Sequence, residues 1–276
     1  MSVRVLFALA ALAALPAAPA APALPPTLAE THGPRGIAYA PRYPLWSDGM
    51  EKRRWIELPA GSAIDKSNPD AWRFPVGTRA WKEFRRDGRP VETRFIERLA
   101  DGSWRFLTYR WNEEGTQATL APEEGVPESG IPSRTDCLAC HEGAAVPILG
   151  YSAVQLETEL APALGYLHGN CGHCHNDGAL PALELTLAQS AADPRAGAER
   201  MRASLLGRAS RFRPREATSA PRRVVPGDPD ASLLVARMQS RDALTRMPPL
   251  GVSVPDPNGI AMVRRWIEQL KFHPKE

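Results

Sequence analysis

Residues 91–109 read VETRFIERLADGSWRFLTY. Apolar and polar side chains largely alternate on both sides of Asp101-Gly102, which is the pattern of half-buried strands. Asp-Gly between two such runs is a strong signal for a hairpin turn. A similar alternation occurs over residues 54–58 and 79–84. The pattern predicts an antiparallel meander or a small sandwich over residues 43–120.

The first 23 residues have the features of a secretory signal peptide. Arg4 is followed by an apolar run from Val5 to Leu15 and then by small residues and prolines. The run is shorter than the roughly 20 apolar residues that a membrane-spanning helix needs, and no later stretch is long and apolar enough. We therefore expect residues 1–23 to be cleaved on export to the periplasm, with no membrane span in the mature chain.

Composition divides the remaining chain into three parts. Residues 24–42 are rich in proline and alanine and lack a hydrophobic period, so we expect a linker or an arm over the first domain. Residues 43–150 are expected to form a β-rich domain. Residues 151–276 hold segments with helical periodicity and are expected to form a helical domain. The predicted helices span about residues 152–164, 194–206, 230–238 and 258–270.

All four cysteines lie in two runs of the form C-x-x-C-H. These are Cys137-Leu138-Ala139-Cys140-His141 and Cys171-Gly172-His173-Cys174-His175. This form is the attachment signal for c-type haem. Two thiols at this spacing can each form a thioether with a haem vinyl group, and the next histidine then becomes the proximal iron ligand. The two runs predict two covalently attached haems, with His141 and His175 as iron ligands.

Other uses of these cysteines stay open. The two pairs could hold one structural zinc in an all-thiolate site, act as redox dithiols, or form disulfides. None of these uses requires a histidine directly after each second cysteine. Export also weakens the zinc alternative, because bacteria attach c-type haem outside the cytoplasm.

Sixth iron ligands were sought among the remaining methionines and histidines. Met247 lies in Arg246-Met247-Pro248-Pro249-Leu250-Gly251, where the prolines restrict the loop and the thioether can bind iron. It is predicted to complete the second haem, the alternative being a core methionine. His168 is a possible additional ligand, or a partner of the backbone or of a haem propionate. His173 and His273 are expected to face solvent. The candidates for the first haem are His32, His168, Met50, Met201 and Met238.

Several segments together resemble class I cytochrome c over about residues 161–270. They are the second C-x-x-C-H run, VPGDPDASLL at 225–234, MPPLG at 247–251 and the tail at 263–267. With YPLWSDG at 43–49, FPVGT at 74–78 and WNE at 111–113, the whole chain resembles a family of bacterial exported dihaem c-type cytochromes. The resemblance implies an α+β fold, in which an antiparallel β-rich domain precedes an all-α class I cytochrome c-like domain. It also implies electron transfer, with His175 and Met247 as the axial pair.

The expected function is electron exchange with periplasmic redox proteins. A formal net charge of +3 gives no reason to expect a nucleic-acid partner. The alternative is a dihaem peroxidase or oxidase with an open coordination site on the first haem, for which Glu142 is a weak acid–base candidate. The β-rich part could also dock the chain to a periplasmic dehydrogenase. Arginines that either steer acidic partners or form a solvated face are Arg200, Arg202, Arg208, Arg211, Arg213, Arg215, Arg222 and Arg223.

Overall fold

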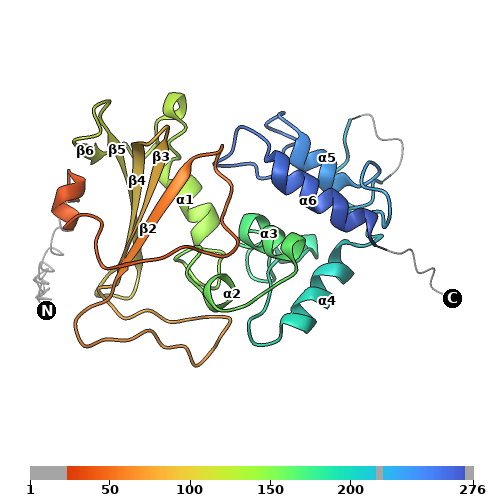
Figure 1. Ribbon diagram of the computed structural model, residues 1–276, viewed down its shortest axis with the longest axis horizontal. Coiled ribbons are helices and arrows are strands. Elements are labelled where there is room, and N and C mark those ends of the chain that lie inside the picture. The colour runs from red at the N-terminus through yellow and green to blue at the C-terminus, as the bar shows by residue number, and fades with distance from the viewer. Residues whose placement is uncertain (1–23, 216–219, 271–276) are drawn as a thin grey trace, which may run out of the picture.

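A computed structural model of the chain describes residues 24–215 and 220–270. The predicted signal peptide and His273 lie outside these residues. The described part contains a six-stranded antiparallel sheet whose strands lie side by side in chain order (Figure 1). Its strands are β1 (Ile37–Ala38), β2 (Glu51–Glu57), β3 (Arg79–Arg86), β4 (Arg89–Arg98), β5 (Trp104–Trp111) and β6 (Ala118–Leu120).

The outer face of the sheet carries an aromatic core. Trp81, Phe95 and Tyr109 are buried there together with Leu28 of the short 3-10 helix η1 (Leu28–Thr31). The N-terminal segment crosses this face, because Thr27 pairs with Thr119 at one edge and β1 pairs with β2 at the other. Ordered structure therefore begins before Tyr43, where the sequence placed its start.

The first C-x-x-C-H run lies on α1 (Arg134–His141), which follows the 3-10 helix η2 (Pro127–Ser129). Ser133 and Asp136 form a capping box that satisfies free backbone N–H groups at the start of this helix. α1 packs against β5 on the inner face of the sheet, between the sheet and the remaining helices (Figure 1). The sheet thus supplies one wall behind the first motif.

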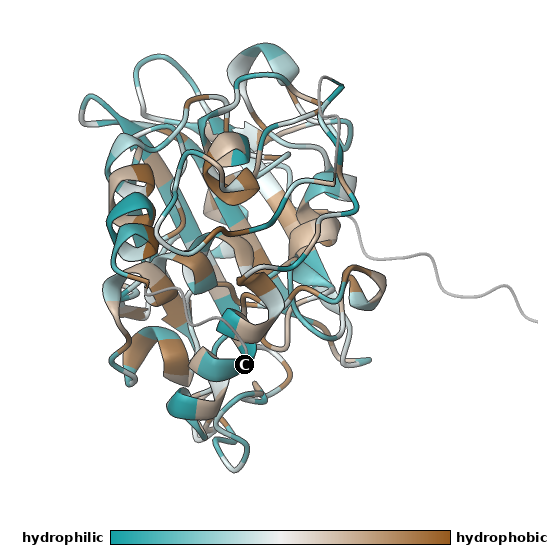
Figure 2. Ribbon diagram, turned by 90° about the vertical axis from the view of Figure 1, so that its right-hand side faces the viewer, coloured by the Kyte–Doolittle hydropathy of each residue, from teal (hydrophilic) through white to brown (hydrophobic). Residues whose placement is uncertain are grey.

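The second half of the chain contains short helices joined by long irregular segments. α3 contacts α6, and α5 also contacts α6, around a core that includes Leu167, Val235 and Val263. The helices viewed in Figure 2 carry apolar stretches beside polar ones, as amphipathic helices do. They are α2 (Ala153–Leu156), α3 (Pro162–Cys171), η3 (Pro181–Leu183), α4 (Pro194–Leu205), α5 (Leu233–Gln239) and α6 (Pro257–Glu268).

The predicted fold class, with an all-α class I cytochrome c-like second domain, is wrong. Helices cover less than half of the described residues from 151 onward, and the largest ordered unit of the chain is the antiparallel sheet. The helix expected over 152–164 is divided, because α2 ends at Leu156 and a separate helix, α3, begins at Pro162. Between α4 and α5 the chain makes isolated bridges, such as Leu206 with Val224, in place of a helix.

The helices of the described residues are also too short or too polar to cross a lipid bilayer. This agrees with the expected absence of a membrane span only for the part of the chain that the structure describes.

Candidate functional site

Both C-x-x-C-H runs open into one cavity between the sheet and the helices. The cavity encloses about 1730 Å³, including the part that is open to solvent. Every predicted attachment residue and one predicted sixth ligand line it: Cys137, Cys140, His141, Cys171, Cys174, His175 and Met247.

His141 is held in an orientation that suits a metal ligand. Its Nδ1 donates a hydrogen bond to the carbonyl of Pro147 at 2.6 Å, which leaves Nε2 without a proton. A ligating histidine commonly donates its second ring nitrogen to a backbone carbonyl in this way. The ring packs on Phe106 of β5 with the ring centroids 4.9 Å apart. Burial lowers the pKa of His141 to about 3, so the imidazole is neutral at physiological pH.

His175 follows α3 and lines the cavity from the helical side. Its Nδ1 is buried and has no hydrogen-bond partner among the described residues. Burial, followed by the nearby Arg237 charge, lowers the pKa of His175 to about 4. A buried nitrogen without a partner is costly in a folded protein, and a ligand in the cavity is a direct way to satisfy the ring.

Met247 lines the same cavity, and its loop is tied to α5. The Met247 N–H donates to the carbonyl of Arg237 at 3.0 Å, and Arg237 Nε donates to the carbonyl of Thr245 at 2.8 Å. These bonds fix the loop on both sides of Arg246. The structure therefore brings Met247 and His175 to one cavity, as the sequence predicted.

Residues 43–48, here called the N-terminal strap, join the second motif to the methionine loop. The Trp46 backbone N–H donates to Asn170 Oδ1 at 2.7 Å, one residue before Cys171. Trp46 Nε1 donates to the carbonyl of Val254 at 2.8 Å. The Asp48 carboxylate accepts the N–H groups of Ser253 and Val254, each at 2.9 Å. The sequence singled out this stretch, but it did not indicate that the strap anchors the methionine loop.

The other predicted sixth ligands do not line this cavity. Met201 and Met238 are buried in the helical core, as core methionines often are. His168 accepts a hydrogen bond from the Gln189 N–H at its Nδ1, 3.1 Å away, and lines a separate cavity. Burial lowers its pKa to about 4. Met50 and His32 line none of the three cavities described for this chain.

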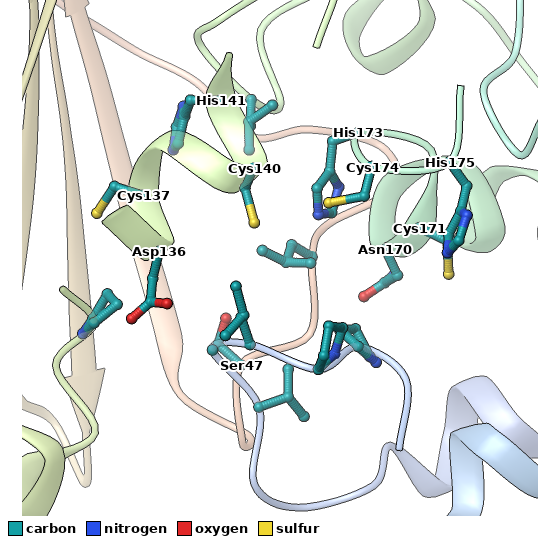
Figure 3. Close-up of a pocket in the computed structure, with 18 of the residues that line it drawn as sticks. Ser47, Asp136, Cys137, Cys140, His141, Asn170, Cys171, His173, Cys174 and His175 are labelled. Carbon is teal, nitrogen blue, oxygen red and sulfur yellow. The ribbon is translucent and has the colours of Figure 1, made fainter. Parts of the chain in front are cut away.

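The two motifs meet at Cys140, His173 and Cys174, here called the thiol junction. One ligand atom from each side chain lies within 4.8 Å of the other two. Figure 3 shows the sulfur of Cys174 pointing towards Cys140 past the His173 ring. His173 is half-buried and lines the cavity. The predicted solvent-facing position of His173 is therefore wrong. All four thiols are free, and Cys137 and Cys171 lie outside the group, so the four sulfurs do not gather as an all-thiolate zinc site requires.

The pKa values of the two junction thiols shift in opposite directions. Hydrogen bonds from the Cys174 and His173 side chains lower the pKa of Cys140 to about 5. The same contact with Cys140, together with burial, raises the pKa of Cys174. Burial alone raises the pKa of Cys171 to about 12.

Three cations stand side by side on the inner face of the sheet, and we call them the cation row. Arg54 of β2 pairs with Lys82 of β3, and Lys82 pairs with Arg94 of β4. Lys82 and Arg94 line the cavity, whereas Arg54 is only 6% exposed and its Nε has no partner. Like charges directly opposite each other destabilise a sheet. Arg94 binds Glu92 at 2.6 Å, which leaves the other two cations without a carboxylate partner among the described residues.

The electrostatics of the cation row show that it is unbalanced. Burial, followed by the Arg54 and Arg94 charges, holds the pKa of Lys82 well below its usual range. Burial lowers the pKa of Arg54 as well. Sequence reasoning missed this row, although its signal was present. Positions 52, 54 and 56 share one strand face by their period of two, and Ile56 marks that face as the inner one.

Neither a family model, nor a curated protein, nor a solved structure matches this chain. The chemistry of the site is nonetheless specific. It combines two neutral imidazoles, four free thiols, one thioether and an unbalanced group of cations around one large cavity. Such a set can bind a metal-containing group that also presents negative charge.

Proposed function

We propose that this protein is an exported electron carrier that binds two c-type haems covalently in the shared cavity. The observation that carries the proposal is that the cysteines and histidines of both C-x-x-C-H runs line one cavity together with Met247. Cys137 and Cys140 would attach the first haem, and Cys171 and Cys174 the second. The signal-peptide features of residues 1–23 support a periplasmic location, where bacteria attach such haems.

The residues present fit haem in three respects. His141 and His175 are neutral, and each keeps a ring nitrogen free for iron. Apolar side chains supply a large part of the wall, as a macrocycle requires; they include Leu185, Leu187, Leu205, Leu233 and Leu234. Lys82 lines the cavity and has no carboxylate partner among the described residues. The carboxylates of haem propionates would supply that missing negative charge.

Bound haem iron supplies a one-electron change of oxidation state, and axial histidine and methionine raise its reduction potential. The chain holds and shields that group. His175 and the uncharged Met247 thioether would hold the second iron. The Arg237 and Asp48 hydrogen bonds restrain the Met247 loop and so limit rearrangement between redox states.

A second candidate function is a peroxidase-like activity at the first haem. It is favoured by one observation: none of the predicted sixth ligands for that haem lines the cavity, whereas Lys82 and Arg94 do. A cationic pocket near His141 would accept a small ligand such as peroxide. Glu142, next to His141, does not line the cavity and is a poor acid–base candidate there.

The experiment that separates these functions is electron paramagnetic resonance of the oxidised, exported protein after its haem content has been measured. Two low-spin haems per chain support the electron carrier. One low-spin and one high-spin haem support the peroxidase, and peroxide should then alter the high-spin signal. A chain with bound zinc and no haem would contradict both functions. Ser substitutions at Cys137 and Cys140, or at Cys171 and Cys174, assign each signal to its motif.

A further inference from the structure

The two C-x-x-C-H runs, together with the residues that directly follow them, are packed against each other. The Cys174 thiol contacts the carbonyl of Ala139 at 3.8 Å. Asn176 Nδ2 donates to the carbonyl of Gly143 at 3.0 Å. A side-chain carbon placed on Gly143 would lie only 2.5 Å from the Cβ of Ala179. The segments that carry the two motifs are therefore in close contact with each other.

The side chains of the two motifs meet at the thiol junction. Cys140 reaches it from α1, which is fixed against β5. Cys174 reaches it from the turn after α3, where the Cys174 and His175 N–H groups bond to the carbonyl of Cys171. His173 completes the group, with all three ligand atoms within 4.8 Å of one another (Figure 3). Elements from both halves of the chain thus hold the two sulfurs in place.

Attachment chemistry gives this contact a consequence. In a c-type haem each cysteine sulfur bonds to a carbon that is itself bonded to the edge of the ring, so each sulfur marks a ring edge. Because the Cys140 and Cys174 sulfurs are neighbours, the groups attached to them are joined at neighbouring edges. The Cys137 and Cys171 sulfurs lie outside the junction. The second cysteine of each motif is therefore the one that connects the sites.

We propose that the thiol junction couples the two haem sites into one redox unit, so that the state of one site is sensed at the other. This proposal rests on the function proposed above. His173 is a positioning residue in the junction, because a ring nitrogen of its side chain lies within 4.8 Å of both the Cys140 and the Cys174 sulfur. One haem would then be bonded to the Cys140 sulfur and the other to the Cys174 sulfur, and both sulfurs belong to the thiol junction.

The test is electron paramagnetic resonance of the haem-loaded protein at stepwise reduction. Neighbouring paramagnetic centres broaden or split each other's signals. We expect the signal of the haem that stays oxidised to sharpen or shift when its partner is reduced. If that signal is unchanged by reduction of the partner, the proposal is overturned.

A pair of single-haem variants provides a second route to the same answer. One carries C137S and C140S, and the other C171S and C174S. We expect the spectrum of the oxidised wild type to differ from the sum of the two variant spectra; an exact sum would overturn the coupling. If either variant does not fold, stepwise reduction of the wild type gives the result alone.

The role of His173 is tested with His173→Ala, and Asp177→Ala, at an exposed neighbouring position, is its control. We expect the His173 variant to retain two haems but to show weaker coupling in the stepwise reduction. Unchanged coupling would remove His173 from the proposal. Haem content shows which of the two proposals fails. A chain without haem contradicts the proposed function, whereas two haems with independent signals contradict only the coupling through the thiol junction.

Discussion

Asp48 Oδ1 accepts the backbone N–H of Val254 at 2.9 Å, across 206 residues of chain. Asp48 is held in the left-handed region at φ 50°, which aspartate tolerates better than most residues. The contact ties the strap that precedes β2 to the segment that follows Met247. Asp48 is far in sequence from both C-x-x-C-H runs, and its carboxylate helps to hold the loop that carries the predicted iron ligand.

Removal of this contact should loosen the methionine loop. Asp48→Ala removes the acceptor of two backbone N–H groups, and we expect a loss of about 1 kcal/mol in the stability of the loop. The near-infrared absorption that reports methionine bound to ferric haem should weaken. Asp101→Ala, which breaks a local hairpin contact with Ser103, is the matched control. Equal effects of both variants on the absorption would show that Asp48 has no special role.

Met247 itself is tested by replacement with leucine. Met247→Leu keeps apolar bulk in the cavity but removes the sulfur. We expect the second haem to become high-spin or to take a new ligand, with a lower reduction potential. Met238→Leu changes a methionine of the helical core and should leave the spectrum as it is. If Met247→Leu also leaves spectrum and potential unchanged, another residue holds that iron.

The fit of the strap against α3 depends on glycine. A Cβ placed on Gly165 would lie 2.2 Å from the Tyr43 ring. We expect Gly165→Ala to lower the free energy of unfolding by roughly 1–3 kcal/mol through overpacking, measured by urea denaturation. Gly178→Ala, where the nearest neighbour would be 3.4 Å away, should have little effect.

The cause of that loss can be checked with a double mutant. If the clash with Tyr43 is responsible, Tyr43→Ala should cost less stability in the Gly165→Ala background than in the wild type. Strictly additive effects would show that the destabilisation has another source.

Much of the secondary structure could be predicted because its signals are local. The alternating runs at 79–84, 91–96 and 104–109 fall within β3, β4 and β5. The helices predicted at 194–206 and 258–270 correspond to α4 and α6. The all-α second domain, which the resemblance to class I cytochrome c implied, was wrong because the segments between these helices are irregular and contain prolines and isolated bridges. Local periodicity says where helices form, but it does not say what joins them.

The candidate site also has residues that the sequence could predict and a contact that it could not. Cys140 and His175 could be named from the spacing of their motifs. The thiol junction could not, because it depends on the packing of α1 against the turn after α3, and linear spacing carries no information on that contact. The cation row was accessible in part, since Arg54 and Lys82 share the inward strand parity of their apolar neighbours.

The cation row should tune the first haem. Lys82→Gln removes a positive charge that lines the cavity, and less positive charge favours the oxidised iron. We expect the reduction potential of the first haem to fall by on the order of tens of millivolts. Lys66→Gln removes a lysine whose ammonium lies beside Glu157 and serves as control. If the reduction potential of the first haem is unchanged or rises, the proposal that haem propionates lie near Lys82 is contradicted.

The arginines of the second half fall into two groups. Arg223 donates to the carbonyls of Leu183, Glu184 and Ser204 and is structural. Other members of the group, such as Arg211, Arg213 and Arg215, are exposed. We expect glutamine at these three positions to slow reduction by an acidic donor protein at low salt, with the difference disappearing at high salt. Equal rates for wild type and variant at low salt would remove the steering role.

The most direct measurement is the haem content of the exported chain, determined by the pyridine haemochrome method after denaturation and removal of free haem. Covalent attachment through both motifs predicts two haems per chain, and one haem in each of the two Cys-to-Ser double variants. A chain that retains no haem, or that loses it all on denaturation, would contradict the proposal that Cys137, Cys140, Cys171 and Cys174 attach haem.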